Sequence, residues 1–275
     1  MQRLHLFYFF SIISIGVLLS SAASQTNAFQ EMQQGRQAID QAKYDEAIQH
    51  FQKVLEAVPS NVNAQFYLGS AYAHKYVPGV DKEDNIALAK QAIEHYQAVL
   101  DKDKFNTFSH TAAKGIALLD AQMNKFDDAK TFYGEAKQLD PRDPEPFYCT
   151  ALIDWTQASQ FRAAERAKLN LKAEDSLAAK SPTVCAKVKE KNLPNLEDGI
   201  ANLKQALKLN PEYEEAATYM NLIYLERADI ECTDPAARKA DLKAADDWTQ
   251  KLATIKKTKA THPQTKKDDD NDEDQ

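Results

Sequence analysis

Apolar side chains recur with a helical period along most of the chain, and the segment that begins at Tyr44 shows the pattern most clearly. Ala47, Phe51 and Val54 are three or four residues apart and therefore fall on one face of a helix. Pro59 follows and ends the helix, because proline cannot donate a backbone hydrogen bond. The same order of a small, a large and a smaller apolar residue returns at Ala92, Tyr96 and Val99, at Ala129, Tyr133 and Ala136, and at Gly199, Leu203 and Ala206. This recurrence predicts a series of amphipathic helices.

Each of these helices is expected to pack against a helix that precedes it in the chain. The clearest partner contains Leu68, Gly69 and Tyr72, where the glycine is small enough for another helix to approach closely. The expected partner helices are residues 29–41, 63–75, 107–122, 145–156 and 214–230. The pattern therefore predicts an all-α protein of about five helix-turn-helix units.

The second unit resembles a known family. Leu68-Gly69-x2-Tyr72 is followed by a second helix with a small residue, an aromatic residue four positions later and an apolar residue three further on. This order resembles the tetratricopeptide repeat of about 34 residues. The resemblance covers about residues 29–256 and implies a right-handed superhelical solenoid of such units. The fifth unit has Asn221 where the family has glycine, and we expect this unit to cap the array.

The repeats are interrupted by inserts. Ala129 and Gly199 are separated by about twice the length of one repeat, which predicts a helical insert at residues 157–196 in the fourth unit. Within the insert we expect two short helices, at residues 162–169 and 184–191. A shorter insert at residues 77–84 contains Pro78-Gly79, which indicates a turn.

The amino terminus carries a targeting pattern. Arg3 and His5 precede an apolar run from Leu6 to Leu19, and small residues follow at positions 20–24. This arrangement is typical of a secretory signal peptide, here residues 1–24. The apolar run is shorter than the roughly 20 residues that a membrane-spanning helix needs. We therefore expect cleavage and a periplasmic or secreted protein without stable membrane insertion; the alternative is a protein tethered by an uncleaved signal.

The charge of the chain is concentrated at its carboxyl end. The net charge is −7, from 34 basic and 41 acidic residues, and the last eight residues are mostly acidic. Residues 257–275, Lys-rich and then acidic, have too little apolar surface to fold and are expected to be disordered. The acidic tract either binds basic partners or only maintains solubility. The repeat domain, residues 25–256, has no basic face, which argues against a nucleic-acid partner.

The chain has three cysteines, Cys149, Cys185 and Cys232. In an oxidising compartment an odd number leaves one thiol free or in an intermolecular bond. Cys149 lies in an apolar helical segment, whereas the other two lie in an insert or at a helix end among polar residues. We expect a disulfide between Cys185 and Cys232; the alternative is three unrelated thiols. No CxxC spacing suggests a metal site.

No constellation of residues points to catalysis. The chain lacks a GxSxG elbow, an HExxH motif and a glycine-rich phosphate loop, and its histidines are scattered. Paired acids such as Asp127-Asp128 lie in first turns, where they complement the helix dipole. We therefore expect a protein that is not an enzyme and that carries no cofactor or metal.

The resemblance implies a binding surface on the concave face, which is lined by the first helix of each unit. Carried over by repeat position, the candidate partner-binding residues are Arg36, Phe66, Ser70, His74, Lys114, Tyr148, Leu152 and Trp155. Only Arg36 and Lys114 among them are basic, and they are far apart, which disfavours a clamp for a terminal carboxylate. The surface is otherwise apolar and aromatic, which favours a peptide or a helix of a protein partner.

The sequence thus predicts a non-catalytic protein–protein interaction scaffold or adaptor of an extracytoplasmic compartment. An alternative is an apolar ligand-binding module whose pocket is closed by the insert at residues 157–196. In that case the insert folds back and fills the concave face, and Trp155 belongs to the core. An enzyme would need a cluster of polar groups with shifted pKa values in a cleft.

Overall fold

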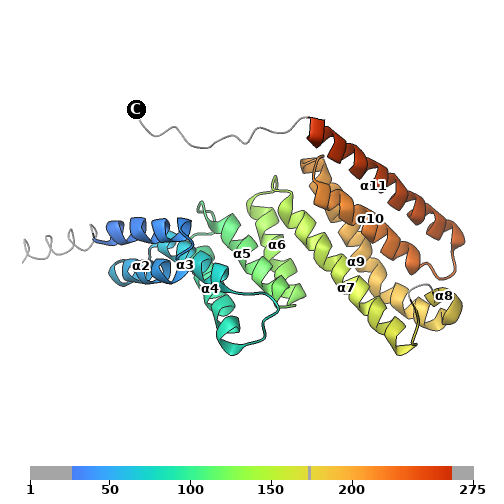
Figure 1. Ribbon diagram of the computed structural model, residues 1–275, viewed down its shortest axis with the longest axis horizontal. Coiled ribbons are helices and arrows are strands. Elements are labelled where there is room, and N and C mark those ends of the chain that lie inside the picture. Colours follow the sequence, from blue (N-terminus) through green and yellow to red (C-terminus); the bar gives the residue numbers. More distant parts are fainter. Residues whose placement is uncertain (1–26, 173–174, 262–275) are drawn as a thin grey trace, which may run out of the picture. The chain divides into compact units, whose positions relative to one another are not determined.

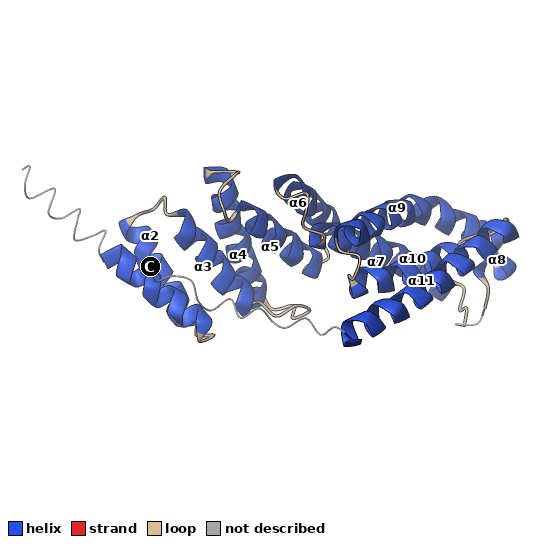
Figure 2. Cartoon of the chain, turned by 90° about the horizontal axis from the view of Figure 1, so that it is seen from above, coloured by secondary structure: helices blue, strands red, loops and turns tan. Residues whose placement is uncertain are grey.

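The computed structural model describes residues 27–172 and 175–261, and every regular element in these ranges is helical (Figures 1 and 2). The predicted signal peptide and the acidic end of the predicted tail lie outside the described residues. The chain divides into two compact units, residues 1–140 and residues 141–275. The all-α architecture of helical hairpins expected from the sequence is confirmed.

Unit 1 consists of three successive helical hairpins. Its helices are residues 27–40, α2 (Tyr44–Ala57), α3 (Val62–Lys75), α4 (Glu83–Lys102), α5 (Ser109–Gln122) and α6 (Phe126–Leu139). The first helix of each hairpin begins and ends within two residues of the bounds predicted from the sequence. The helices pack in chain order, and α3 also contacts α5, so that first helices of neighbouring hairpins lie together.

Tyr96 shows why the small residues of the repeat are needed. Its ring lies on α4 against both α3 and α5, and the two positions that face it are glycines. A Cβ atom at Gly69 would lie 2.9 Å from the ring, and one at Gly115 would lie 2.6 Å from it. Both distances are shorter than van der Waals contact, so the close packing of three helices around Tyr96 requires glycine at these positions.

Unit 2 contains longer hairpins than unit 1. Its helices are α7 (Glu145–Lys168), α8 (Leu177–Lys180), α9 (Pro182–Leu209), α10 (Glu214–Asp229) and α11 (Pro235–Thr261). Helix α7 packs on α9, α10 packs on α9 and α11, and the short α8 packs on α9.

The predicted organisation of the insert is wrong. Residues 162–169 are not a separate short helix but the last turns of α7, and residues 184–191 are the first turns of α9. The two extensions pair with each other: Val188 is fully buried, and the buried Asn192 side-chain amide donates to the Ala158 carbonyl at 2.7 Å. The insert therefore lengthens the fourth hairpin, because its apolar positions continue the helical period on both sides.

Helix α11 is mostly solvated. Only Asp241 and Ala245 are buried on it. At the atypical position Asn221, the side-chain amide donates to the Ala245 carbonyl at 2.9 Å, so α10 and α11 are joined by a hydrogen bond where the family places a glycine contact. The helix reaches Thr261, five residues past the predicted domain boundary at 256, so the start of the predicted tail is helical. None of the described helices is long and apolar enough to cross a membrane.

Candidate functional site

A small apolar pocket lies in unit 1 between the first helices α3 and α5, as the repeat pattern predicts. It has a volume of about 260 Å³. Helix α3 contributes Ser70 and His74, α5 contributes Leu118 and Gln122, and Tyr96 also lines it. We call it the α3/α5 pocket. Two of the candidate partner-binding residues, Ser70 and His74, are thus brought together in one pocket.

The chemistry of the α3/α5 pocket is governed by Tyr96 and Leu118. Burial raises the pKa of Tyr96 to about 12, and its hydrogen bond with Ser70 acts in the opposite direction. The phenol therefore stays neutral at physiological pH. Leu118 exposes 49 % of its surface beside this ring. An exposed leucine at the mouth of an apolar pocket suits the burial of an apolar side chain from a partner.

An apolar loop, which we call the apolar rim, adjoins the pocket at Pro78. The loop that carries the pocket residue Pro78 also presents Val77 and Val80, which are 53 % and 37 % exposed. Asn85 holds this loop from α4: its Oδ1 accepts the Val77 N–H at 2.9 Å, and its Nδ2 donates to the Val77 and Val80 carbonyls at 2.9 and 2.8 Å. Gly79 permits the turn with its φ of 79°. The apolar rim is therefore preorganised rather than mobile.

The other candidates in unit 1 lie outside the lining of this pocket. The Phe66 ring stacks on Phe108 at 4.4 Å and, partly buried, packs against the hydrophobic core. Arg36 is exposed, with its guanidinium 5.8 Å from the centre of the Tyr67 ring. Lys114 is half-buried on α5.

The candidates of unit 2 form an aromatic cluster between α7 and α10. Tyr148 lies 5.1 Å from Tyr213 and 5.7 Å from Tyr219 between ring centres, and Trp155 lies 5.4 Å from Tyr219. Burial, followed by the charge of Tyr219, raises the pKa of Tyr148 to about 12. Leu152 lies on α7 one helical turn from both Tyr148 and Trp155, and its side chain is partly buried. The ring contacts of these two candidates come from Tyr219 on α10 and from Tyr213 just before it.

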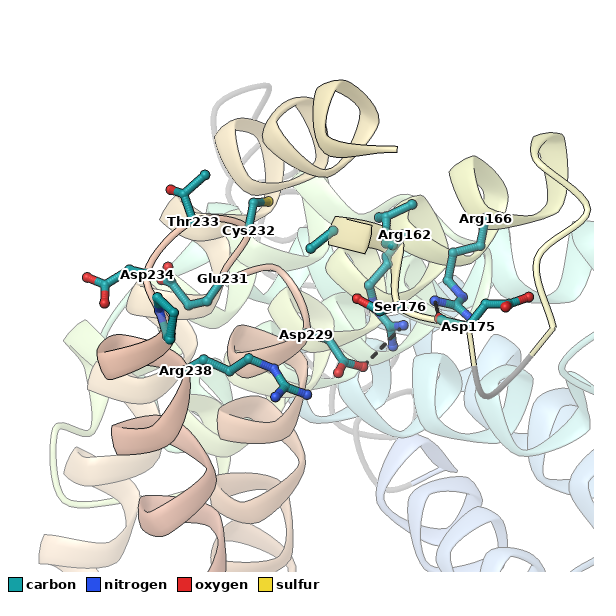
Figure 3. A pocket seen from close by; sticks show the side chains of 13 residues that line it. Arg162, Arg166, Asp175, Ser176, Asp229, Glu231, Cys232, Thr233, Asp234 and Arg238 are labelled. Carbon is teal, nitrogen blue, oxygen red and sulfur yellow. Dashed lines mark hydrogen bonds and ion pairs between the residues drawn. The ribbon is translucent and has the colours of Figure 1, made fainter. Parts of the chain in front are cut away.

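The extended fourth hairpin builds a second, larger pocket that the sequence did not reveal (Figure 3). We call it the insert pocket; its volume is about 850 Å³. Arg162 and Arg166 from α7 and Arg238 from α11 line it, together with Asp175 and Asp229. The insert pocket differs from the alternative expected from the sequence, an apolar ligand pocket closed by the insert, because its lining is mostly charged and polar. A smaller apolar depression of about 400 Å³ lies beside it on α9.

An ion pair links α7 and α10 beside the insert pocket. The Arg162 Nε donates to Glu226 Oε1 at 2.6 Å, and its Nη2 donates to Oε2 at 2.7 Å. Glu226 is almost fully buried, and this bidentate geometry raises the pKa of Arg162. In the sequence, the spacing of Arg162 and Arg166 by one helical turn indicated that both arginines lie on one face of a helix. Nothing in the neighbouring sequence indicated that residues 229–238 would complete a pocket with them.

Cys185 and Cys232 form a disulfide, which is the pairing expected from the sequence, and Cys149 is a free thiol. The bond ties the loop between α10 and α11 to the start of α9. No group of three or more potential metal ligands occurs in the part of the chain that the structure describes.

Comparison with known proteins agrees with this architecture. Residues 32–106 match the tetratricopeptide repeat family. Comparison with curated protein sequences finds no match. Among solved structures, a crystal structure of MamA has a TM-score of 0.56 at 16 % identity, over 87 % of this chain and 97 % of that chain. MamA from Desulfovibrio magneticus RS-1 has a TM-score of 0.55 at 14 % identity, over 84 % and 96 %. YrrB, described as a TPR protein with an unusual peptide-binding site, has a TM-score of 0.50 at 12 % identity, over 84 % and 92 %. At these identities the likeness shows the fold, which is that of tetratricopeptide repeat proteins.

Proposed function

We propose that this protein is a non-catalytic interaction scaffold that binds a peptide or helix of a partner protein through the α3/α5 pocket and its apolar rim. The observation that carries the proposal is the exposed Leu118 beside a preformed apolar pocket, at a position that faces the concave surface in the repeat. The fold supports the same function, since tetratricopeptide repeats present preformed surfaces to protein partners.

The pocket is suited to one anchor side chain. Its volume of about 260 Å³ holds a single apolar side chain and excludes a larger ligand. Full burial of a leucine or phenylalanine anchor contributes about 2 kcal/mol, and covering the exposed half of Leu118 adds about 1 kcal/mol. The remaining affinity comes from the rim formed by Val77 and Val80.

We also propose that the protein acts in an extracytoplasmic compartment, the periplasm or the exterior. The signal-like pattern of residues 1–24 and the Cys185–Cys232 disulfide both support this location, because disulfides persist in oxidising compartments. Fractionation of the native host with an antibody against the chain tests it. Recovery in the cytoplasmic fraction with all three cysteines open to alkylation would contradict it.

A peptide display library provides a defined test of the binding site. We expect selection on the wild-type protein to enrich peptides with one large apolar residue, and Leu118→Asp to abolish their binding by placing a charge at the pocket mouth. Leu169→Asp is the matched control, because Leu169 is a similarly exposed leucine in unit 2. Enriched peptides that bind Leu118→Asp as well as wild type would refute the α3/α5 pocket as the site.

A further inference from the structure

The insert pocket lies in unit 2, apart from the aromatic candidates of that unit. Arg162 follows Trp155 by seven residues on α7, which is about 10 Å along the helix axis. The rest of the pocket comes from residues 175–178, the loop between α10 and α11, and the first turn of α11 (Figure 3). Apart from Asp229, the last residue of α10, these residues come from the insert, from the loop between α10 and α11 and from the first turn of α11, so the pocket lies outside the repeat pattern identified in the sequence.

The walls of the insert pocket are held in place by a disulfide and by hydrogen bonds to backbone groups. The disulfide fixes the α10–α11 loop at Cys232. Arg166 donates to the carbonyl oxygens of Lys172 and Asp175 and so fixes these two residues. Asp234 Oδ1 accepts N–H groups in the first turn of α11 at 3.0 and 2.9 Å. A pocket whose walls are already ordered binds a ligand at a lower entropic cost.

Most charges on the walls are cancelled by partners. Glu231 pairs with Lys189 at 2.6 Å, and Asp175 pairs with Lys180 at 3.3 Å. The carboxylate of Asp234 caps α11, where the helix dipole stabilises a negative charge. These groups are therefore occupied and do not determine what the pocket binds.

Asp229 and Arg238 differ from these groups, and from Arg166, which donates to two backbone carbonyls. Within the described residues, the Asp229 carboxylate, whose side chain is 51 % exposed, makes one ion pair, at 3.4 Å with Nη1 of Arg162, and Glu226 already neutralises that guanidinium. Arg238 has neither an ion pair nor a side-chain hydrogen bond to any residue in the ranges that the structure describes. Figure 3 shows its side chain extending from α11 toward Asp229, and no ion pair joins the two. Among the residues that the structure describes, the pocket therefore carries one carboxylate with a single weak ion pair, Asp229, and one guanidinium without an ion pair, Arg238.

We propose that the insert pocket binds a small zwitterion of the amino-acid class, with the ligand carboxylate on Arg238 and the ligand ammonium group on Asp229. A guanidinium presents a planar fork of donors that matches a carboxylate, and a carboxylate accepts hydrogen bonds from an ammonium group. A ligand with only one sign of charge would leave the opposite wall group unpaired and would be repelled by it. The volume of about 850 Å³ is within the range of small-ligand sites, which is about 300–1,000 Å³.

The test uses the oxidised full-length chain. Thermal unfolding with each of the twenty amino acids at millimolar concentration identifies the best ligand, and calorimetric titration measures its affinity. The N-acetylated and the amidated forms of the same amino acid each lack one charge, and we expect each to bind at least roughly tenfold more weakly. Stabilisation by none of the twenty, or equal binding of either single-charge form, would overturn the proposal. Binding of inorganic phosphate in their place would also overturn it.

Paired variants assign the binding to this pocket. Arg238→Gln and Asp229→Asn are expected to weaken the best amino acid by roughly tenfold each, because each removes one charge contact. Lys239→Gln and Asp246→Asn remove the same charges from exposed positions of α11 outside the pocket and should leave affinity unchanged. Circular dichroism confirms that all four variants fold. Equal affinity of the pocket variants and the controls would refute the assignment.

Discussion

Removal of the Cys185–Cys232 disulfide should destabilise unit 2 by about 4 kcal/mol. The bond joins residues 47 positions apart, and the chain-entropy relation gives about this value for a loop of that length. The perturbation is the double substitution Cys185→Ala and Cys232→Ala. Alanine is chosen because Cys185 is fully buried and a serine hydroxyl there would add a desolvation cost. The loss should lower the melting temperature of this unit on the order of 10 °C.

Tryptophan fluorescence measures this effect in unit 2 alone. The chain has two tryptophans, Trp155 and Trp248, and both lie in unit 2. Urea unfolding followed by fluorescence should therefore show a lower midpoint in the double variant, whereas helical circular dichroism also reports unit 1. Cys149→Ala, which removes the free thiol, is the control and should leave the midpoint nearly unchanged. If the double variant loses less than about 1 kcal/mol of unfolding free energy, the disulfide does not stabilise unit 2 by restricting the unfolded chain as the loop-length relation assumes.

Two further predictions concern the packing around Tyr96. Gly115→Ala should cost about 1–3 kcal/mol in thermal unfolding, because the new Cβ would lie 2.6 Å from the Tyr96 ring. Gly134→Ala is the control, because an added Cβ on α6 would meet open space there, and it should be neutral or stabilise by up to about 1 kcal/mol. Equal effects of Gly115→Ala and Gly134→Ala on stability would refute the contact with the Tyr96 ring as the cause. Because burial raises the pKa of Tyr96 to about 12, the folded state binds its proton more tightly than the unfolded state does. Stability should therefore fall as pH rises above about 10, and Tyr96→Phe should reduce this loss in urea unfolding; an unchanged pH profile would contradict the assignment.

The helices of the repeat could be predicted because their signals are local. Ala92, Tyr96 and Val99 form one stripe within two turns, and the same stripe in three other segments gives the hairpins. The insert was misjudged because Ser181-Pro182 separates two polar segments that look like short helices in isolation. Their continuity with α7 and α9 depends on tertiary contacts, such as the hydrogen bond from Asn192 to Ala158.

The sites could be predicted only in part. Repeat position grouped Ser70 and His74, and both line the α3/α5 pocket, because they are one turn apart on α3. It could not show that the Phe66 ring stacks on Phe108, since Phe108 comes from the next hairpin. The insert pocket escaped prediction for the same reason: Arg162 and Arg238 meet only after three helices have folded between them.

The solvated outer face of α11 limits how the array could be extended. A further hairpin stacked on this helix would have to cover exposed lysines such as Lys251, Lys256 and Lys257. Dehydrating each ammonium group without a partner carboxylate would cost more than the apolar area of one hairpin returns. Lengthening the protein by grafted repeats therefore requires insertion before α7, with α7 to α11 retained together, because the Cys185–Cys232 disulfide and the Arg162–Glu226 ion pair join them.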